Sequence, residues 1–163
     1  MSSIEPARTV YLVDDDATLL RMLQAMVTSI GVEAQAFSSA RDFLSAYHPT
    51  PSECLVCDLR MPDIDGIGLQ KKLEAMKATL PIIFLTGFAE VSIAVEAMKN
   101  GAFDFIEKPF SAQALLGKIQ SALDCSKERH VKALEHQAIT ARMELLTPRE
   151  RDVIDHVVAG RSS

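Results

Sequence analysis

The side chains best suited to chemistry in this sequence stand at the ends of four short apolar segments. They are carboxylates, a hydroxyl and an ammonium group: Asp14, Asp15, Asp16, Asp58, Thr86 and Lys108. Carboxylate oxygens are the hard ligands that Mg²⁺ and Mn²⁺ prefer. A divalent cation, an ammonium group and a hydroxyl around one further carboxylate can stabilise the charge on a phosphoryl group. In such a site Asp58 can act as the nucleophile and form an aspartyl phosphate.

These side chains can act together only if the apolar segments are strands of one sheet. Five such segments alternate with amphipathic, helix-like stretches in the first 125 residues: 10–13, 32–37, 54–57, 81–85 and 103–106. This alternation is typical of an α/β fold with a five-stranded parallel sheet that is doubly wound, with helices on both faces. The third and fourth segments are continuously apolar, as strands buried on both faces are.

The carboxyl ends of parallel strands meet at one edge of a sheet, where ligands bind in open α/β folds. Taken singly, each candidate has a structural explanation, since Asp16 is a typical helix cap, Thr86 a common strand end and Lys108 a turn residue. Their convergence at one edge favours a functional site. The first strand is followed by neither GxxxxGK[ST] nor GxGxxG, so the pattern does not indicate nucleotide binding.

The three cysteines form neither a disulfide framework nor an obvious metal site. Cys54 and Cys57 have the CxxC spacing but lie in an apolar segment expected to be a strand, where residues three apart point to opposite faces. The sequence has no second pair of cysteine or histidine residues close to Cys54 and Cys57. With Cys125 the count is odd, and we interpret these residues as buried structural cysteines.

The last helix of the α/β unit is expected to continue beyond it. It begins near Ala112, and neither glycine nor proline interrupts the chain from Lys118 to Thr147. Its later apolar spacing is too weak for a coiled coil, so we expect a linker helix. Thr147, Pro148 and Glu150 then form the start signal of another helix. One amphipathic helix cannot bury its own apolar face, so a partial, truncated all-α domain is expected at the end.

Charge and composition narrow the class of protein. The chain has 163 residues, a net charge of −5 and 48% hydrophobic residues, which excludes a disordered protein. Residues 1–124 carry 10 basic and 16 acidic side chains, so this part is expected to repel nucleic acid. The sequence has no apolar run long enough to span a bilayer, and it shows no signal peptide. Both observations predict a cytoplasmic location without a membrane partner.

Four motifs resemble those of receiver domains from two-component response regulators over about residues 8–124. They are Val13-Asp14-Asp15, Asp58-Leu59-Arg60-Met61-Pro62 with Asp65-Gly66, Leu85-Thr86-Gly87, and Lys108-Pro109-Phe110. The segment from Leu146 to Arg151, with Ala159-Gly160, is similar to the opening of a LuxR-type helix-turn-helix domain. Together they resemble the FixJ/NarL class. The resemblance implies a flavodoxin-like receiver domain over 1–125, a linker helix over 126–144 and the truncated start of a LuxR-type domain over 145–163.

The resemblance also implies a phosphoacceptor and a metal site. Asp58 matches the aspartate that accepts the phosphoryl group. Mg²⁺, or Mn²⁺ in its place, would bind Asp15, Asp58 and the backbone carbonyl of Arg60 directly, and Asp14 through a water molecule.

Four further residues match the phosphoryl-binding and switch positions of the family. Thr86 matches the switch hydroxyl, and Gly87 the small residue that keeps the site open. Lys108 matches the lysine that pairs with a phosphoryl oxygen, and its bond to Pro109 is expected to be cis. Phe105 matches the aromatic switch, here without a hydroxyl group.

The function implied is that of a response regulator that receives a phosphoryl group from a sensor histidine kinase. Phosphorylation would promote homodimerisation through helix 91–100, strand 103–106 and the start of the long helix. DNA binding and transcription control would belong to the missing C-terminal domain, not to this chain. Self-phosphorylation and self-dephosphorylation are expected, but not the turnover of an enzyme.

Two alternatives stay open at this stage. An aspartate-nucleophile phosphatase is expected to have a second acid two residues after the nucleophile, where this sequence has Arg60. A stand-alone receiver that only docks partners is disfavoured by the linker helix and by the segment from Thr147 to Gly160.

Overall fold

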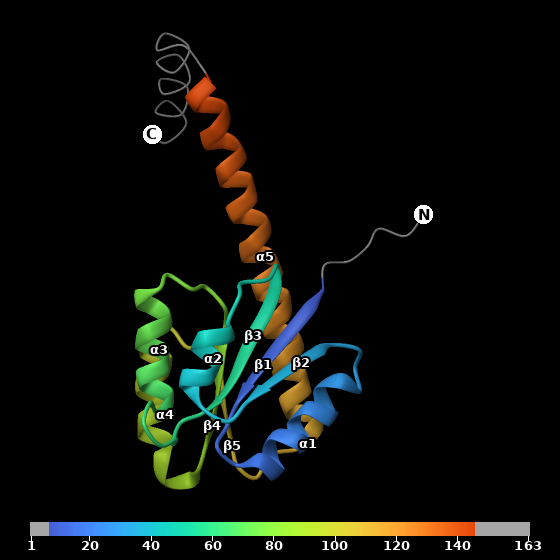
Figure 1. The fold of residues 1–163 in the computed structure, drawn as a ribbon, viewed down its shortest axis with the longest axis vertical. Helices are drawn as coiled ribbons and strands as arrows, with labels where there is room; N and C mark the ends of the chain where they lie inside the picture. The colour runs from blue at the N-terminus through green and yellow to red at the C-terminus, as the bar shows by residue number, and fades with distance from the viewer. Residues whose placement is uncertain (1–6, 146–163) are drawn as a thin grey trace. The chain divides into compact units, whose positions relative to one another are not determined.

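The computed structural model describes residues 7–145, except for the side chain of Phe88, so the helix expected after Thr147 lies outside the described residues. Strands and helices alternate along the chain (Figure 1). The elements are β1 (Arg8–Val13), α1 (Ala17–Thr28), β2 (Glu33–Phe37), α2 (Ala40–Ala46), β3 (Ser52–Asp58), α3 (Gly66–Ala75), β4 (Ile82–Thr86), the 3-10 turn η1 (Phe88–Glu90), α4 (Val91–Lys99), β5 (Asp104–Glu107) and α5 (Ala112–Leu145).

The five strands form one parallel sheet in the order β2-β1-β3-β4-β5, which confirms the predicted fold class. Val13 pairs with Cys57, and Asp58 pairs with Leu85. The strand order changes direction between β1 and β3, so the loops after these two strands diverge to opposite sides. The crevice between such loops is where doubly wound sheets bind ligands.

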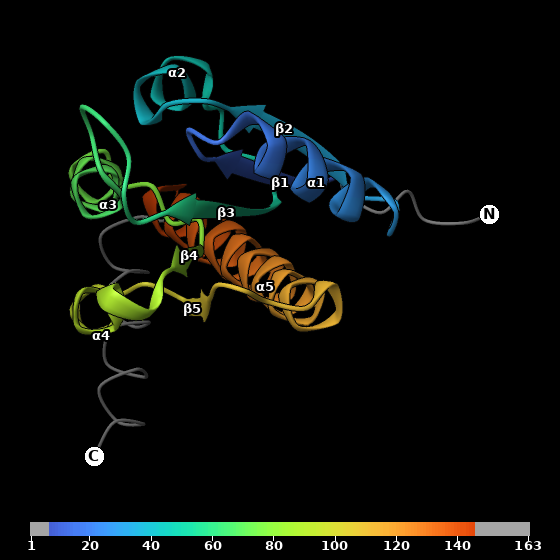
Figure 2. The same cartoon turned by 90° about the horizontal axis from the view of Figure 1, so that it is seen from below.

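The sheet is covered on both faces. Helices α1 and α5 lie on one face, and α2, α3 and α4 lie on the other (Figure 2). Buried side chains such as Leu23 and Ile119 fill the first side, and Phe43 and Leu69 fill the second. The cysteines of β3 divide as predicted, because Cys54 belongs to the first core and Cys57 to the second.

Helix caps place the starts of three helices at or near the carboxyl edge of the sheet. The Asp16 carboxylate accepts the N–H groups of Thr18 and Leu19 at the start of α1, as predicted. Ser39 caps α2, and Asp65 caps α3. Each cap satisfies backbone donors that the first turn of a helix leaves without partners. The turn after β1 is therefore short, which keeps Asp14 and Asp15 beside the end of β3.

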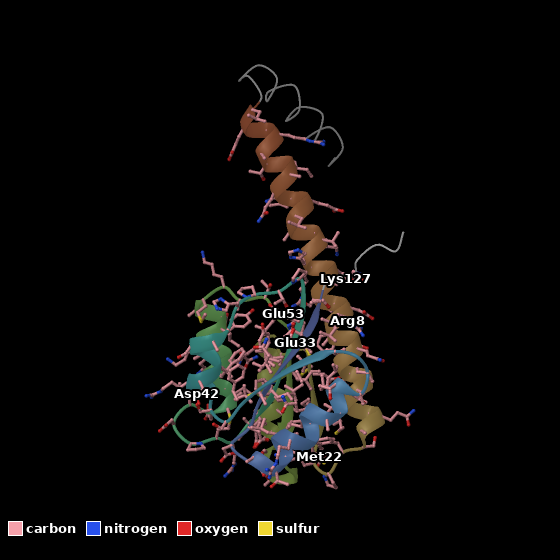
Figure 3. The ribbon with its side chains drawn as sticks, turned by 45° about the vertical axis from the view of Figure 1, so that its right-hand side comes forward. Arg8, Met22, Glu33, Asp42, Glu53 and Lys127 are labelled. Carbon is pink, nitrogen blue, oxygen red and sulfur yellow. The ribbon has the colours of Figure 1, made fainter. Side chains whose placement is uncertain are left out.

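Helix α5 is long, as predicted, and it is anchored to the amino end of β3. The Ser52 hydroxyl donates to the carbonyl of Leu123 at 3.0 Å, and Ser126 Oγ accepts the Glu53 N–H at 3.0 Å. Glu53, which is labelled in Figure 3, is itself buried. Its carboxylate accepts the Tyr47 hydroxyl at 2.6 Å. By internal contacts the chain divides into Met1–Glu128 and Arg129–Ser163, a division that falls inside α5.

Among residues 7–145, no helix combines the length and the apolar composition that crossing a bilayer requires.

Gly66 allows the start of α3 to pass directly over the end of β3. A Cβ atom there would lie 2.8 Å from the Asp58 carbonyl oxygen and 3.0 Å from Leu59 Cα, both backbone atoms that cannot move independently. We expect Gly66→Ala to lower the free energy of unfolding by about 2 kcal/mol, as overpacking does in a dense core. Urea denaturation followed by circular dichroism measures this.

Gly117→Ala is the matched control, because it places the same methyl group in a helix with no atom within 4 Å. It is expected to stabilise the protein by about 0.5–1 kcal/mol through helix propensity alone. Equal effects of the two substitutions would show that the close approach at Gly66 does not matter for stability.

Candidate functional site

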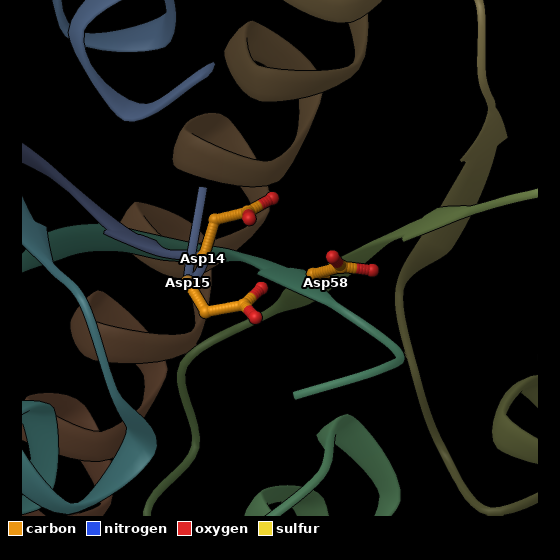
Figure 4. Close-up of side chains that lie close together, drawn as sticks. All are labelled: Asp14, Asp15 and Asp58. Atoms are coloured by element: carbon orange, nitrogen blue, oxygen red, sulfur yellow. The ribbon is translucent and has the colours of Figure 1, made fainter. Parts of the chain in front are cut away.

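Three carboxylates gather where β1 and β3 end (Figure 4). Asp14 and Asp15 follow β1, Asp58 is the last residue of β3, and one oxygen of each lies within 4.8 Å of the others. Asp14 is 1% exposed and Asp58 8%, whereas Asp15 faces solvent. This set of hard oxygen ligands, open to solvent on one side, fits a cation such as Mg²⁺ that keeps several waters.

Lys108 brings an ammonium group to the same edge. Its Nζ lies 3.3 Å from Asp58 Oδ2 and 3.8 Å from Asp14 Oδ2. The residue lies in the turn between β5 and α5, and its peptide bond to Pro109 is cis. One ammonium group beside three carboxylates leaves an excess of negative charge when all three are ionised, which a divalent cation can neutralise.

Asp14 is the most deeply buried carboxylate of this cluster, and its pKa is shifted mainly by that burial. Burial, and to a smaller extent the charge of Asp58, raises the pKa of Asp14 to about 6, although the Asp16 N–H opposes the shift. That N–H donates to Oδ1 at 2.8 Å, whereas Oδ2 is buried without a hydrogen-bond partner. A buried carboxylate oxygen without a donor is costly. A water molecule held by a metal ion would supply the missing donor, so the residues present fit a cation.

Thr86, Gly87 and Phe105 lie on the other side of Asp58. Thr86 ends β4, is fully buried and donates its hydroxyl to the carbonyl of Gly87 at 3.1 Å. Phe105 lies one strand further, in β5, where it is partly buried and packs against the core on the α2–α3–α4 side. The structure therefore brings together Asp14, Asp15, Asp58 and Lys108, and places Phe105 further along the sheet.

One residue that the motifs did not identify also belongs to this site. The Glu90 carboxylate accepts the Gly87 N–H at 3.0 Å and forms an ion pair with Arg60 at 2.5 Å. The Arg60 N–H in turn donates to Asp58 Oδ1 at 3.3 Å. The available sequence signal is Gly87-x-x-Glu90, which has the spacing between a helix cap and its third residue. A groove of about 520 Å³, lined by Asp15 and Arg60 among others, lies beside the acidic cluster.

The family described as "Response regulator receiver domain" matches residues 10–120 of this chain. The chain therefore belongs to the response regulator receiver domain family. Receiver domains of this family bind Mg²⁺ at an acidic cluster and work with sensor histidine kinases, as signalling proteins rather than turnover enzymes.

Similar proteins of known class show which kind of response regulator this chain is. Transcriptional regulatory protein FixJ of Bradyrhizobium diazoefficiens is 40% identical over 94% of this chain and 75% of its own length. Transcriptional regulatory protein TdiR of Thauera aromatica is 38% identical over 96% of this chain and 69% of its own length. The solved structure of the response regulator StyR is 38% identical, has a TM-score of 0.82, and is matched over 94% of this chain and 78% of its own. The chain is a two-component response regulator of the FixJ class.

Proposed function

We propose that Asp58 is the phosphoacceptor of this response regulator and that a sensor histidine kinase is the donor. The observation that carries the proposal is the position of the Asp58 carboxylate, between the acidic pair Asp14 and Asp15 and the ammonium group of Lys108. Mg²⁺, or Mn²⁺ with the same ligand preferences, would be held by Asp15, Asp58 and the Arg60 carbonyl, with Asp14 holding a bound water.

In the proposed reaction an Asp58 oxygen attacks the phosphorus atom of the donor. The bond from phosphorus to the leaving group breaks, and the leaving group keeps the electron pair. The bound cation supplies charge neutralisation for the phosphoryl oxygens. Lys108, already 3.3 Å from Asp58, pairs with another phosphoryl oxygen. Slow attack of water on the same phosphorus atom breaks its bond to the Asp58 oxygen, releases inorganic phosphate and restores the carboxylate, so the chain undergoes self-phosphorylation and self-dephosphorylation.

The proposed output is a change at the surface formed by α4, β5 and the first part of α5. The Thr86 hydroxyl would leave the Gly87 carbonyl for a phosphoryl oxygen, Gly87 leaves room for that group, and Phe105 would turn inward. Two copies would then dimerise through this surface in the cytoplasm.

The domain organisation proposed is a receiver domain over 1–125, a linker helix over 126–144 and the beginning of a LuxR-type DNA-binding domain over 145–163. The relatives support this division, because they match 94–96% of the chain and therefore extend beyond the receiver domain. DNA binding would belong to the LuxR-type domain, and the acidic residues 1–124 would not contribute to it.

Phosphorylation of the chain by acetyl phosphate tests the proposal directly. With Mg²⁺, we expect the intact mass to increase by one phosphoryl group, located by peptide mapping at Asp58. Sedimentation of the same sample is expected to show a dimer, and a sample with EDTA is expected to stay unmodified and monomeric. A label on another residue would contradict the phosphoacceptor assignment, and a labelled monomer would contradict dimerisation as the output.

A further inference from the structure

We propose that Glu90 competes with the phosphoryl group for the Gly87 N–H and that Arg60 controls this competition. The inference rests on the proposed function, because it concerns how Asp58 becomes phosphorylated. Glu90 is a positioning residue in this proposal. Its carboxylate occupies a donor of the site in the unphosphorylated protein and leaves that donor when a phosphoryl group arrives.

The contacts form a continuous chain around Asp58. Leu85 pairs with Asp58 in the sheet, so Gly87, two residues further, lies at the same edge. Its N–H donates to Glu90 Oε2 at 3.0 Å, and Glu90 Oε1 pairs with Arg60 Nε at 2.5 Å. Arg60 completes the chain, because its N–H donates to Asp58 Oδ1 at 3.3 Å. A group added to Asp58 therefore enters a site in which the Gly87 N–H and the Arg60 guanidinium are already engaged by the Glu90 carboxylate.

The charges of Glu90 and Arg60 determine how this arrangement affects phosphorylation. The Glu90 side chain is 13% exposed, so water screens its negative charge only in part. Phosphoryl donors are anions, and this carboxylate adds to the repulsion from Asp14, Asp15 and Asp58. The Arg60 side chain is 73% exposed, which makes its pair with Glu90 a weak one that can open. Once the pair opens, the Arg60 guanidinium is free to contact a phosphoryl oxygen.

The competition exchanges one anionic acceptor for another. Before phosphorylation the Gly87 N–H donates to a carboxylate oxygen, and after phosphorylation it donates to a phosphoryl oxygen on Asp58. The number of hydrogen bonds is conserved, and Glu90 with its negative charge is released at the start of α4. The release would therefore report phosphorylation to the helix that belongs to the proposed output surface.

Glu90→Gln separates this role from ordinary helix capping. Glutamine keeps an oxygen that can accept the Gly87 N–H at the same reach, but it removes the charge. We expect the variant to be phosphorylated by acetyl phosphate about fivefold faster than the wild type at low ionic strength, with the ratio falling towards one as salt increases. Glu96→Gln is the matched control, since it removes an exposed charge from α4, the helix that directly follows Glu90, and Glu96 has no place in the site.

Arg60→Gln supplies the opposite test, because it leaves the Glu90 charge without its cation. We expect slower phosphorylation in this variant, and we expect Glu90→Gln to remove that defect in the double variant. Beryllofluoride affinity, measured by calorimetry in the presence of Mg²⁺, should follow the same order. Equal rates and affinities for wild type and Glu90→Gln would overturn the proposal and leave Glu90 as a cap.

Different results would contradict the Glu90 competition and the assignment of Asp58 as the phosphoacceptor. If the wild type is labelled at Asp58 but Glu90→Gln behaves like Glu96→Gln, only the competition is wrong. If the wild type is not labelled at Asp58, the phosphoacceptor assignment itself is wrong. Thermal melting of each variant shows that rates are compared between folded proteins, and an unfolded Glu90→Gln variant would identify its role as structural.

Discussion

Replacing Asp58 with asparagine is expected to abolish phosphoryl uptake from acetyl phosphate while the protein stays folded. The amide has the size of the carboxylate but lacks its nucleophilic oxygen, so the rate should fall at least about a thousandfold. The substitution also removes one charge from a cluster in which three carboxylates lie within 4.8 Å. Intact mass spectrometry after incubation with Mg²⁺ measures the uptake, and a thermal melt verifies the fold.

Asp63→Asn is the matched control for this experiment. Asp63 is an exposed acid in the loop after β3, and its φ of 66° is one that asparagine adopts readily. The control variant should gain the phosphoryl group at the wild-type rate. Full labelling of Asp58→Asn would mean that another side chain accepts the group, and Asp14 or Asp15 would then be the first residues to examine.

Asp14→Asn is expected to stabilise the metal-free protein at neutral pH. The folded-state pKa of Asp14 is about 6 and its ordinary value is 3.8, so folding favours the protonated form. The stability associated with that form is fully present below pH 4 and is lost as the pH rises to about 6 and above. Two pKa units correspond to about 3 kcal/mol. Asparagine does not ionise, so the variant should avoid this loss.

Urea denaturation in EDTA at pH 4 and at pH 7.5 tests this expectation. The variant should differ little from the wild type at pH 4 and should be more stable by up to about 3 kcal/mol at pH 7.5. Adding millimolar Mg²⁺ at pH 7.5 should stabilise the wild type more than the variant, because binding to the folded state stabilises it. Identical pH dependence of the two proteins would show that ionising the buried Asp14 carboxylate does not cost the folded protein stability.

The central strands could be predicted from the sequence because burial on both faces leaves a continuous apolar run. The amino ends of β1 and β3 could not, since each strand begins two residues before its run. There Arg8 and Thr9 pair with Ser52 and Glu53. Ser52 can occupy a buried position in β3 because its hydroxyl donates to the Leu123 carbonyl of α5, and Ser126 of α5 accepts the backbone N–H of Glu53 beside it; both partners lie far along the chain. Such distant partners leave no local pattern.

The residues of the candidate site could be predicted where they lie at the carboxyl end of a strand. Asp14, Asp15, Asp58 and Lys108 meet because parallel strands bring their carboxyl ends together, and their roles stay predictions. Glu90 was not predicted, because it lies beyond a strand end in the turn η1 and its cation is on another loop. Complementary charges that meet only through the folded backbone are not visible as a local motif.

The burial of two cysteines has a practical consequence for experiments on signalling. Burial raises the pKa of the Cys54 and Cys57 thiols, and alkylating reagents react with thiolates that they can reach. Cys125 is the third and last cysteine of the chain, and it is partly exposed on α5 beside the serine that holds β3. The sequence therefore offers one attachment point for a spin label or fluorophore, at the junction of β3 with α5. Because the chain has no tryptophan, an emitting label there would report on that junction without background from indole.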